Sequence, residues 1–97
     1  MFLKISWQKY RVKEKKNLKV DDEVVDGYFN PIKREIGIEK KLSKKNKQKV
    51  LIHEVIHAIL FNYGHTDKYQ DENLVESITS GIMQVIYDNE KNIFERK

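Results

Sequence analysis

The chain has 97 residues, of which 39% are hydrophobic and 35% are charged, and it contains one proline and no cysteine. This composition is typical of one small folded domain, here residues 1–97, and excludes a disordered chain or a large multi-layer enzyme. The lack of cysteine excludes disulfides, thiolate metal ligands and a cysteine nucleophile, and it favours a cytoplasmic location. We expect no membrane association, since no stretch approaches the roughly 18 apolar residues of a span and no signal peptide is evident.

The net charge of +4 is unevenly distributed, because the first 50 residues carry 15 Lys and Arg against 7 Asp and Glu. A basic half of this kind can bind nucleic acid or an acidic protein. However, the lysines concentrate in segments 13–19 and 40–49, which are typical of a loop and of the approach to a helix. Aromatic residues do not alternate with them, so the pattern favours a solvated surface and disfavours nucleic acid as a partner.

Strands and turns are expected in the first 39 residues. Segment 2–12 is rich in aromatic and β-branched residues and predicts one strand that leads into a polar turn. Segment 18–25 is ambiguous, because its three consecutive acidic residues suit either a short helix or a loop. Segments 27–29 and 35–39 flank the turn signal Asn30-Pro31 and predict a hairpin. We therefore expect a small antiparallel sheet of about three strands.

Two long helices are expected in the rest of the chain. The first runs from Ser43, a candidate N-cap, to Tyr63, since Gly64 then takes the position after the helix end. The second begins near Asp71, and close approach of a neighbouring helix would account for Gly81 within it. Its apolar stripe has 3.6-residue spacing and consists of Leu74, Val75, Ile78, Ile82, Val85 and Ile86. The expected fold class is α+β, with the sheet followed by two packed helices.

The segment 50–61, VLIHEVIHAILF, is apolar around almost the whole helical wheel, which predicts a buried helix. Its only ionisable residues are His53, Glu54 and His57. A buried ionisable group without a partner costs several kcal/mol, so these three side chains must be paired, hydrogen-bonded or metal-bound. A buried polar network without metal is the simpler interpretation.

The spacing of these residues favours a metal site. Four residues turn an α-helix by about 400°, so His53 and His57 project from one face and can bind the same ion. Glu54 lies next to this face and can reach a water on the metal without binding the metal itself. A zinc ion lowers the pKa of its bound water to about 7, and Glu54 would take the proton as the water attacks a carbonyl.

A third protein ligand is expected, because catalytic zinc usually has three. The astacin-like continuation HExxHxxGxxH is absent, since Leu60 and Tyr63 occupy its glycine and histidine positions. His65 is available, although an exposed loop histidine more often has no ligand role. Glu72 and Glu76 lie on one side of the second helix, and the helical wheel does not choose between them.

HEVIH, followed 19 residues after His57 by Glu76 in ESITSG, resembles the gluzincins, zinc peptidases with a glutamate as third ligand. The nearest likeness is to small phage- and prophage-encoded peptidase-like proteins, and a more distant one is to ImmA/IrrE-type peptidases. The likeness covers residues 27–89, in the stretches GYFNPIKREIGIEKKL, VLIHEVIHAIL and LVESITSGIMQVI. It implies a zincin-like fold and, for a phage-encoded protein, a place in the host cytoplasm.

The resemblance also implies roles for single residues. His53, His57 and Glu76 would bind one zinc ion, and Glu54 would be the general base. Ser80 stands where thermolysin-like enzymes hold an acidic partner of a ligating histidine, although a serine supports the histidine less strongly. Gluzincins usually supply a donor to the oxyanion of the transition state from a segment beyond the third ligand, and the candidates here are Tyr63, His65, Tyr69 and Tyr87.

Two functions are compatible with these features. The first is a zinc-dependent metallopeptidase, with the strand at residues 35–39 as the edge of the cleft that binds a peptide or protein substrate. The second is a non-catalytic, zinc-stabilised binding protein of phage or prophage origin that acts on a host protein. The same ligands also accept cobalt, nickel or manganese.

Overall fold

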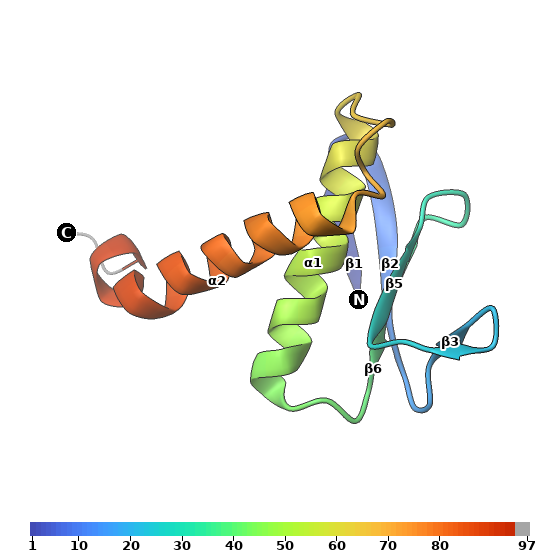
Figure 1. The fold of residues 1–97 in the computed structure, drawn as a ribbon, viewed down its shortest axis with the longest axis horizontal. Helices are drawn as coiled ribbons and strands as arrows, with labels where there is room; N and C mark the ends of the chain where they lie inside the picture. The colour runs from blue at the N-terminus through green and yellow to red at the C-terminus, as the bar shows by residue number, and fades with distance from the viewer. Residues whose placement is uncertain (95–97) are drawn as a thin grey trace.

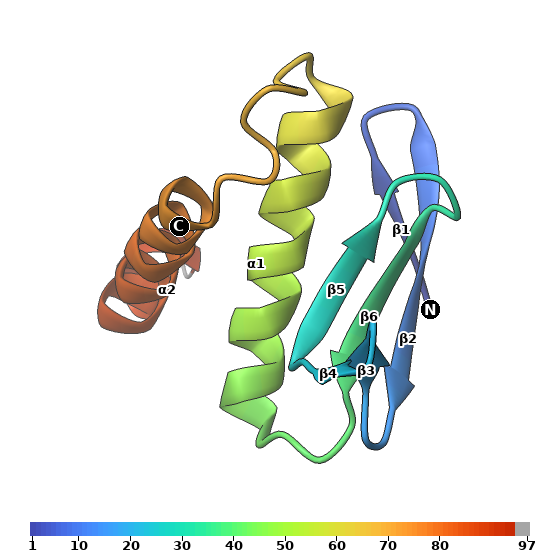
Figure 2. The same cartoon turned by 45° about the vertical axis from the view of Figure 1, so that its right-hand side comes forward.

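The computed structural model describes residues 1–94 and has an α+β fold, which confirms the expected class. The predicted domain also includes residues 95–97, which lie outside the described range. A mixed sheet packs against one side of helix α1 (Lys44–Asn62), and helix α2 (Glu72–Phe94) crosses the other side (Figures 1 and 2). The strands are β1 (Phe2–Ile5), β2 (Gln8–Lys15), β3 (Lys19–Val20), β4 (Glu23–Val24), β5 (Gly27–Asn30) and β6 (Glu35–Glu39).

The main sheet has four strands in the order β1-β2-β6-β5. Strands β2 and β6 are parallel, whereas the β1–β2 and β5–β6 pairs are antiparallel. The expectation of about three antiparallel strands is therefore wrong. Strand β6 is also not an edge, because it lies between β2 and β5, and the edge beside α1 is β5. The paired residues of β2 and β6 are more than 20 positions apart in the sequence, so no local pattern predicts this pairing.

The segment 2–12 forms the β1–β2 hairpin and not the single strand expected. The chain reverses at Ser6 and Trp7, with Ile5 opposite Gln8 and a positive φ of 56° at Ser6. Trp7 is 89% exposed at the tip of this turn. The sequence gives little indication of this turn, because residues with high strand propensity lie on both sides of it. Neither Ser6 nor Trp7 is a strong turn signal.

The segment 18–25 forms a second, two-stranded sheet of β3 and β4, where a short helix or a loop was expected. Asp21 and Asp22 connect the strands, and both have positive φ, which suits a tight hairpin turn. Leu18 is buried beneath this ribbon, and its backbone N–H donates to Glu39 Oε1 at 2.8 Å. This bond, together with one from the Lys41 N–H, holds the pKa of Glu39 below its ordinary value.

The core lies between the sheet and α1. Its buried apolar residues are Ile5, Tyr10, Ile36, Ile38 and Ala58. The predicted ends of α1 are confirmed, since Ser43 Oγ accepts from the Asn46 N–H at 3.2 Å and Gly64, just past the helix, has a φ of +92°. The helix is less completely buried than expected, because Ile59 remains exposed on the side that neither the sheet nor α2 covers.

Helix α2 begins as predicted, with Asp71 Oδ1 accepting from the Leu74 N–H at 3.0 Å. Its buried row is narrower than the predicted stripe and consists of Val75, Thr79 and Met83. Since α2 runs across α1 and not alongside it, Ile82 and Val85 stay exposed (Figure 1). The expected close approach at Gly81 is wrong, because nothing lies within 4 Å of the position of an added Cβ. Within residues 1–94, neither helix offers an apolar stretch long enough to cross a bilayer.

Candidate metal centre

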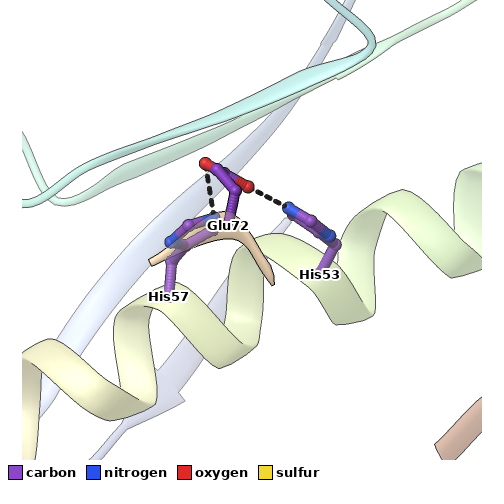
Figure 3. A group of neighbouring side chains, drawn as sticks. All are labelled: His53, His57 and Glu72. Atoms are coloured by element: carbon purple, nitrogen blue, oxygen red, sulfur yellow. Dashed lines mark hydrogen bonds and ion pairs between the residues drawn. The ribbon is translucent and has the colours of Figure 1, made fainter. Parts of the chain in front are cut away.

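His53 and His57 project from one face of α1 toward Glu72, the first residue of α2 (Figure 3). His53 Nε2 lies 3.0 Å from Glu72 Oε1, and His57 Nε2 lies 3.3 Å from Glu72 Oε2. One ligand atom from each of the three residues lies within 4.8 Å of the others. Within the described residues, no other set of histidine, aspartate or glutamate side chains converges in this way. The arrangement could hold a metal ion.

The second nitrogen of each imidazole is also engaged. The Nδ1 of His57 contacts the backbone carbonyl of Tyr69, and the Nδ1 of His53 lies 3.2 Å from Glu76 Oε1. A carbonyl oxygen only accepts, so the Nδ1 of His57 carries a proton, and in the neutral ring the Nε2 then has the lone pair. The carboxylate of Glu76 favours the same tautomer for His53. Both rings thus turn Nε2 toward Glu72 and are held in place at Nδ1.

Glu76 lies one turn after Glu72 and has different contacts. Besides His53, its carboxylate contacts Ser80 Oγ at 3.2 Å and Lys49 Nζ at 3.5 Å. Partial burial acts to raise the pKa of Glu76, but the Ser80 hydrogen bond and the Lys49 ammonium outweigh it, so the pKa lies below the ordinary value. In this arrangement Glu72 faces the two Nε2 atoms, and Glu76 faces the far side of one ring.

Glu54 is buried, with 7% of its surface exposed. Burial, followed by the nearby charge of Glu72, raises the pKa of Glu54 to about 8. Space for its carboxylate comes from Gly27 on β5, where an added Cβ would lie 3.2 Å from Glu54 Oε2. At this pKa the Glu54 carboxyl is mostly protonated at pH 7, and a cation bound beside it would favour the carboxylate form that accepts a proton.

Two hollows flank Glu54, and both are lined by Gly27, Glu54 and Glu72. The larger, of about 450 Å³, lies toward the start of α1 beside Lys49 and Val50. The smaller, of about 220 Å³, is more aromatic and lies beside Tyr28, Phe29 and Tyr69. Together they place open space on both sides of the buried carboxylate, next to the free edge of β5.

The remaining predicted residues lie outside the group. Ser80 donates to Glu76 and contacts neither histidine. Tyr63 and His65 are exposed just after α1, and Tyr87 donates to Gln48 near the start of α1. The contact between the Tyr69 carbonyl and His57 was not predicted, because no sequence signal marks a backbone carbonyl for this role. Tyr69 was expected only as a candidate donor to the oxyanion. Gly27 was also not predicted, and its lack of a Cβ matters only because β5 lies against α1.

Comparison with known protein families, with curated proteins and with solved structures finds no match to this chain. The resemblance to gluzincins therefore stays a prediction. The features that bear on function are the geometry of His53, His57 and Glu72 and of the residues that surround them.

Proposed function

We propose that this chain is a minimal zincin-like domain of the gluzincin type that acts as a zinc-dependent metallopeptidase. His53, His57 and Glu72 would hold one zinc ion per chain. The observation that carries the proposal is the convergence of two Nε2 atoms and one carboxylate, from two helices, within 4.8 Å. Two imidazoles and a carboxylate leave a fourth position open, which is the ligand set of catalytic zinc.

The charges of the group are compatible with a bound cation. With the protons on Nδ1, the Nε2 lone pairs of His53 and His57 face the negative oxygens of Glu72 at 3.0 and 3.3 Å. Such a contact is repulsive unless a proton or a metal ion lies between the atoms. Imidazole nitrogens combined with a carboxylate oxygen suit zinc, and they also accept cobalt, nickel or manganese.

We assign the third ligand to Glu72 and a supporting role to Glu76. The likeness to gluzincins pointed to Glu76 as the ligand and to Ser80 as the partner of a histidine. The contacts support the same two roles one helical turn earlier, with Glu72 as the ligand and Glu76 as the partner of a histidine. Glu76 Oε1 lies 3.2 Å from the Nδ1 of His53. A carboxylate in that position orients the ring and raises the basicity of the nitrogen that binds metal.

The proposed reaction is hydrolysis of a peptide bond. Zinc would supply a water of lowered pKa and polarise the substrate carbonyl. Glu54 would take a proton from the attacking water and deliver it to the departing amine. The substrate would extend along β5, since β6 is enclosed by its neighbours and an edge strand offers unpaired backbone groups. Side chains of the substrate would enter the two hollows beside Glu54.

The test is cleavage of a peptide library by untagged protein whose zinc content is measured in parallel. We expect about one zinc per chain and measurable cleavage in the wild type. Glu54→Gln should retain zinc and lose at least about a hundredfold in kcat/KM, because the general base is removed. Glu14→Gln is the matched control, since Glu14 pairs with Lys47 away from the metal group. Equal turnover by Glu54→Gln and the wild type would exclude this mechanism.

A second candidate is a non-catalytic, zinc-stabilised binding protein that acts on a host protein. It is favoured by the exposed positions of Tyr63 and His65, which leave these two oxyanion candidates outside the metal group. The metal would then mainly tie α2 to α1. Zinc binding without cleavage of any library member would favour this function over the peptidase.

A further inference from the structure

The outer face of the sheet, which points away from α1, is strongly basic. Both helices lie on the opposite side of the sheet (Figure 2). Side chains alternate between the two faces, and the residues opposite the core positions Ile5, Tyr10 and Ile36 point outward. The outward basic residues are Lys4 on β1 and Lys9, Arg11, Lys13 and Lys15 on β2. Lys13 and Lys15, expected in a loop, are thus part of a regular row.

Little of this charge is neutralised. Lys13 pairs with Glu35 at 3.2 Å, and the carboxylate of Glu39 is occupied by the N–H groups of Leu18 and Lys41. Across the part of the chain that the structure describes, no carboxylate lies within 4.0 Å of the charged group of Lys4, Lys9, Arg11 or Lys15. Four cations therefore face solvent without an ion pair, although the charge of Lys15 contributes to the lowered pKa of Glu35.

Aromatic rings accompany these cations. The half-exposed ring of Phe2 lies 4.8 Å from Lys9 Nζ and 5.3 Å from Arg11 Cζ. Pairing of Phe2 with Arg11 across β1 and β2 creates this contact, so it does not show as an alternation along the chain. Trp7 extends from the turn of the same hairpin and is almost fully exposed.

The basic row continues into a hollow of about 330 Å³ beside the β3–β4 ribbon. Its lining includes Tyr28 and Glu35 from the outer face. Four lysines also line it: Lys15, Lys16, Lys19 and Lys33. The Tyr28 hydroxyl donates a hydrogen bond to Glu35, and Lys13 forms an ion pair with it. Both contacts lower the pKa of Glu35, and its carboxylate is engaged by these two neighbours. The hollow is therefore suited to an anionic group such as a phosphate.

We propose that the outer sheet face binds single-stranded nucleic acid, independently of the metal centre. Outward residues of β2 recur about every 6.6 Å and would follow a chain of phosphates, while Phe2 and Trp7 offer rings for base stacking. A four-stranded sheet face with exposed aromatic rings is a known platform on which unpaired bases stack, which favours single strands. The metal side is separate and acidic, with Glu72 and Glu76 beside the histidines.

The test is fluorescence anisotropy with labelled mixed-sequence single-stranded DNA and RNA of about 20 nucleotides, titrated with the intact protein between about 50 and 200 mM salt. Engagement of four phosphates by the four unpaired cations predicts a slope of log K against log salt near about −3. Binding of either oligonucleotide with a slope of that order supports the proposal. The absence of binding to both at about 50 mM salt overturns it.

Matched variants locate the surface. Lys9→Ala combined with Arg11→Ala should lower the affinity at least about tenfold and reduce the slope by about 1.4. Lys44→Ala combined with Lys68→Ala removes the same charge from exposed positions outside the sheet and should change the affinity less than twofold. Phe2→Ala should weaken binding about fivefold or more without changing the slope, because it removes stacking and no charge. Circular dichroism confirms the fold of each variant.

The remaining outcomes oppose the proposal. An equal loss in the two double variants means that only net charge matters and that the sheet face is not the site. Tighter binding to polyglutamate, to a DNA duplex or to phosphatidylserine vesicles than to single strands assigns the face to a different partner. Unchanged binding by Phe2→Ala excludes base stacking on that ring and overturns the single-strand assignment.

Discussion

The imidazoles of His53 and His57 are oriented by what lies at Nδ1. One ring is held by the Tyr69 carbonyl, which belongs to the connection between the helices, and the other by the Glu76 carboxylate on α2. Metal-binding histidines depend on such contacts, which set the tautomer and ring orientation. The two glutamates of α2 thus make separate contacts, and under the proposed function substitution should distinguish them.

We predict that Glu72→Ala weakens zinc binding more than Glu76→Ala does. Loss of a ligand should abolish stoichiometric zinc, whereas loss of the contact to His53 should weaken the affinity by about 10- to 100-fold. Zinc affinity is measured by competition with a chromogenic chelator. Glu23→Ala, at an exposed glutamate in the β3–β4 ribbon, is the control. The reverse order of effects would restore Glu76 as the ligand.

At the scale of elements, β5 approaches α1 most closely at Gly27. An added Cβ there would lie 2.4 Å from Val50 Cγ1 and 3.0 Å from the Gly37 carbonyl oxygen. Neither neighbour retreats easily, since Val50 packs against the core and Gly37 lies in the central strand β6. A glycine at this position therefore brings the sheet edge next to Glu54.

Gly27→Ala should lower the free energy of unfolding by about 1–3 kcal/mol, because the extra carbon forces β5 and α1 apart. Gly81→Ala is a matched control with the opposite sign. It lies in the exposed surface of α2 with nothing near the new Cβ, so it should stabilise the protein by about 0.5–1 kcal/mol. Urea denaturation measures both. An unchanged free energy of unfolding in Gly27→Ala would contradict the close packing of β5 on α1.

On the scale of the whole molecule, the proposed metal would join α2 to the rest of the fold. Helix α2 contacts α1 through a narrow buried row, and Ile82 and Val85 of its apolar stripe are exposed. The ligands come from both helices, so a bound ion adds a crosslink between them. Because the proposed ligands converge only in the folded state, binding of zinc would be linked to folding.

We predict that zinc raises the melting temperature and that a chelator reverses the effect. Free zinc at about 100 times its Kd adds about 2.7 kcal/mol to the free energy of unfolding, and each kcal/mol raises the Tm of a domain this size by about 4–8 °C. Differential scanning calorimetry measures the shift. His57→Ala should eliminate the shift, whereas His65→Ala, in the exposed connection, should leave it unchanged. A wild-type melting temperature that does not change when zinc is added would contradict the metal site.

Local patterns in the sequence were sufficient for the helices and for two of the three residues of the metal group. The ends of α1 and the start of α2 follow from Ser43, Gly64 and Asp71, because capping acts over three or four residues. The convergence of His53 and His57 follows from helical periodicity in the same way. The sequence by itself therefore determined the α+β class and the two histidines that face one partner.

Only the tertiary structure decided the rest. The place of β6 inside the sheet, the exposure of β5 and the basic row beside Phe2 all depend on pairing between distant strands. The position of Glu72 opposite both Nε2 atoms depends on where the connection after α1 delivers the start of α2, which a helical wheel does not contain. The physical reason is range: capping and periodicity act within a turn, whereas strand order and helix crossing are set by packing across the whole chain.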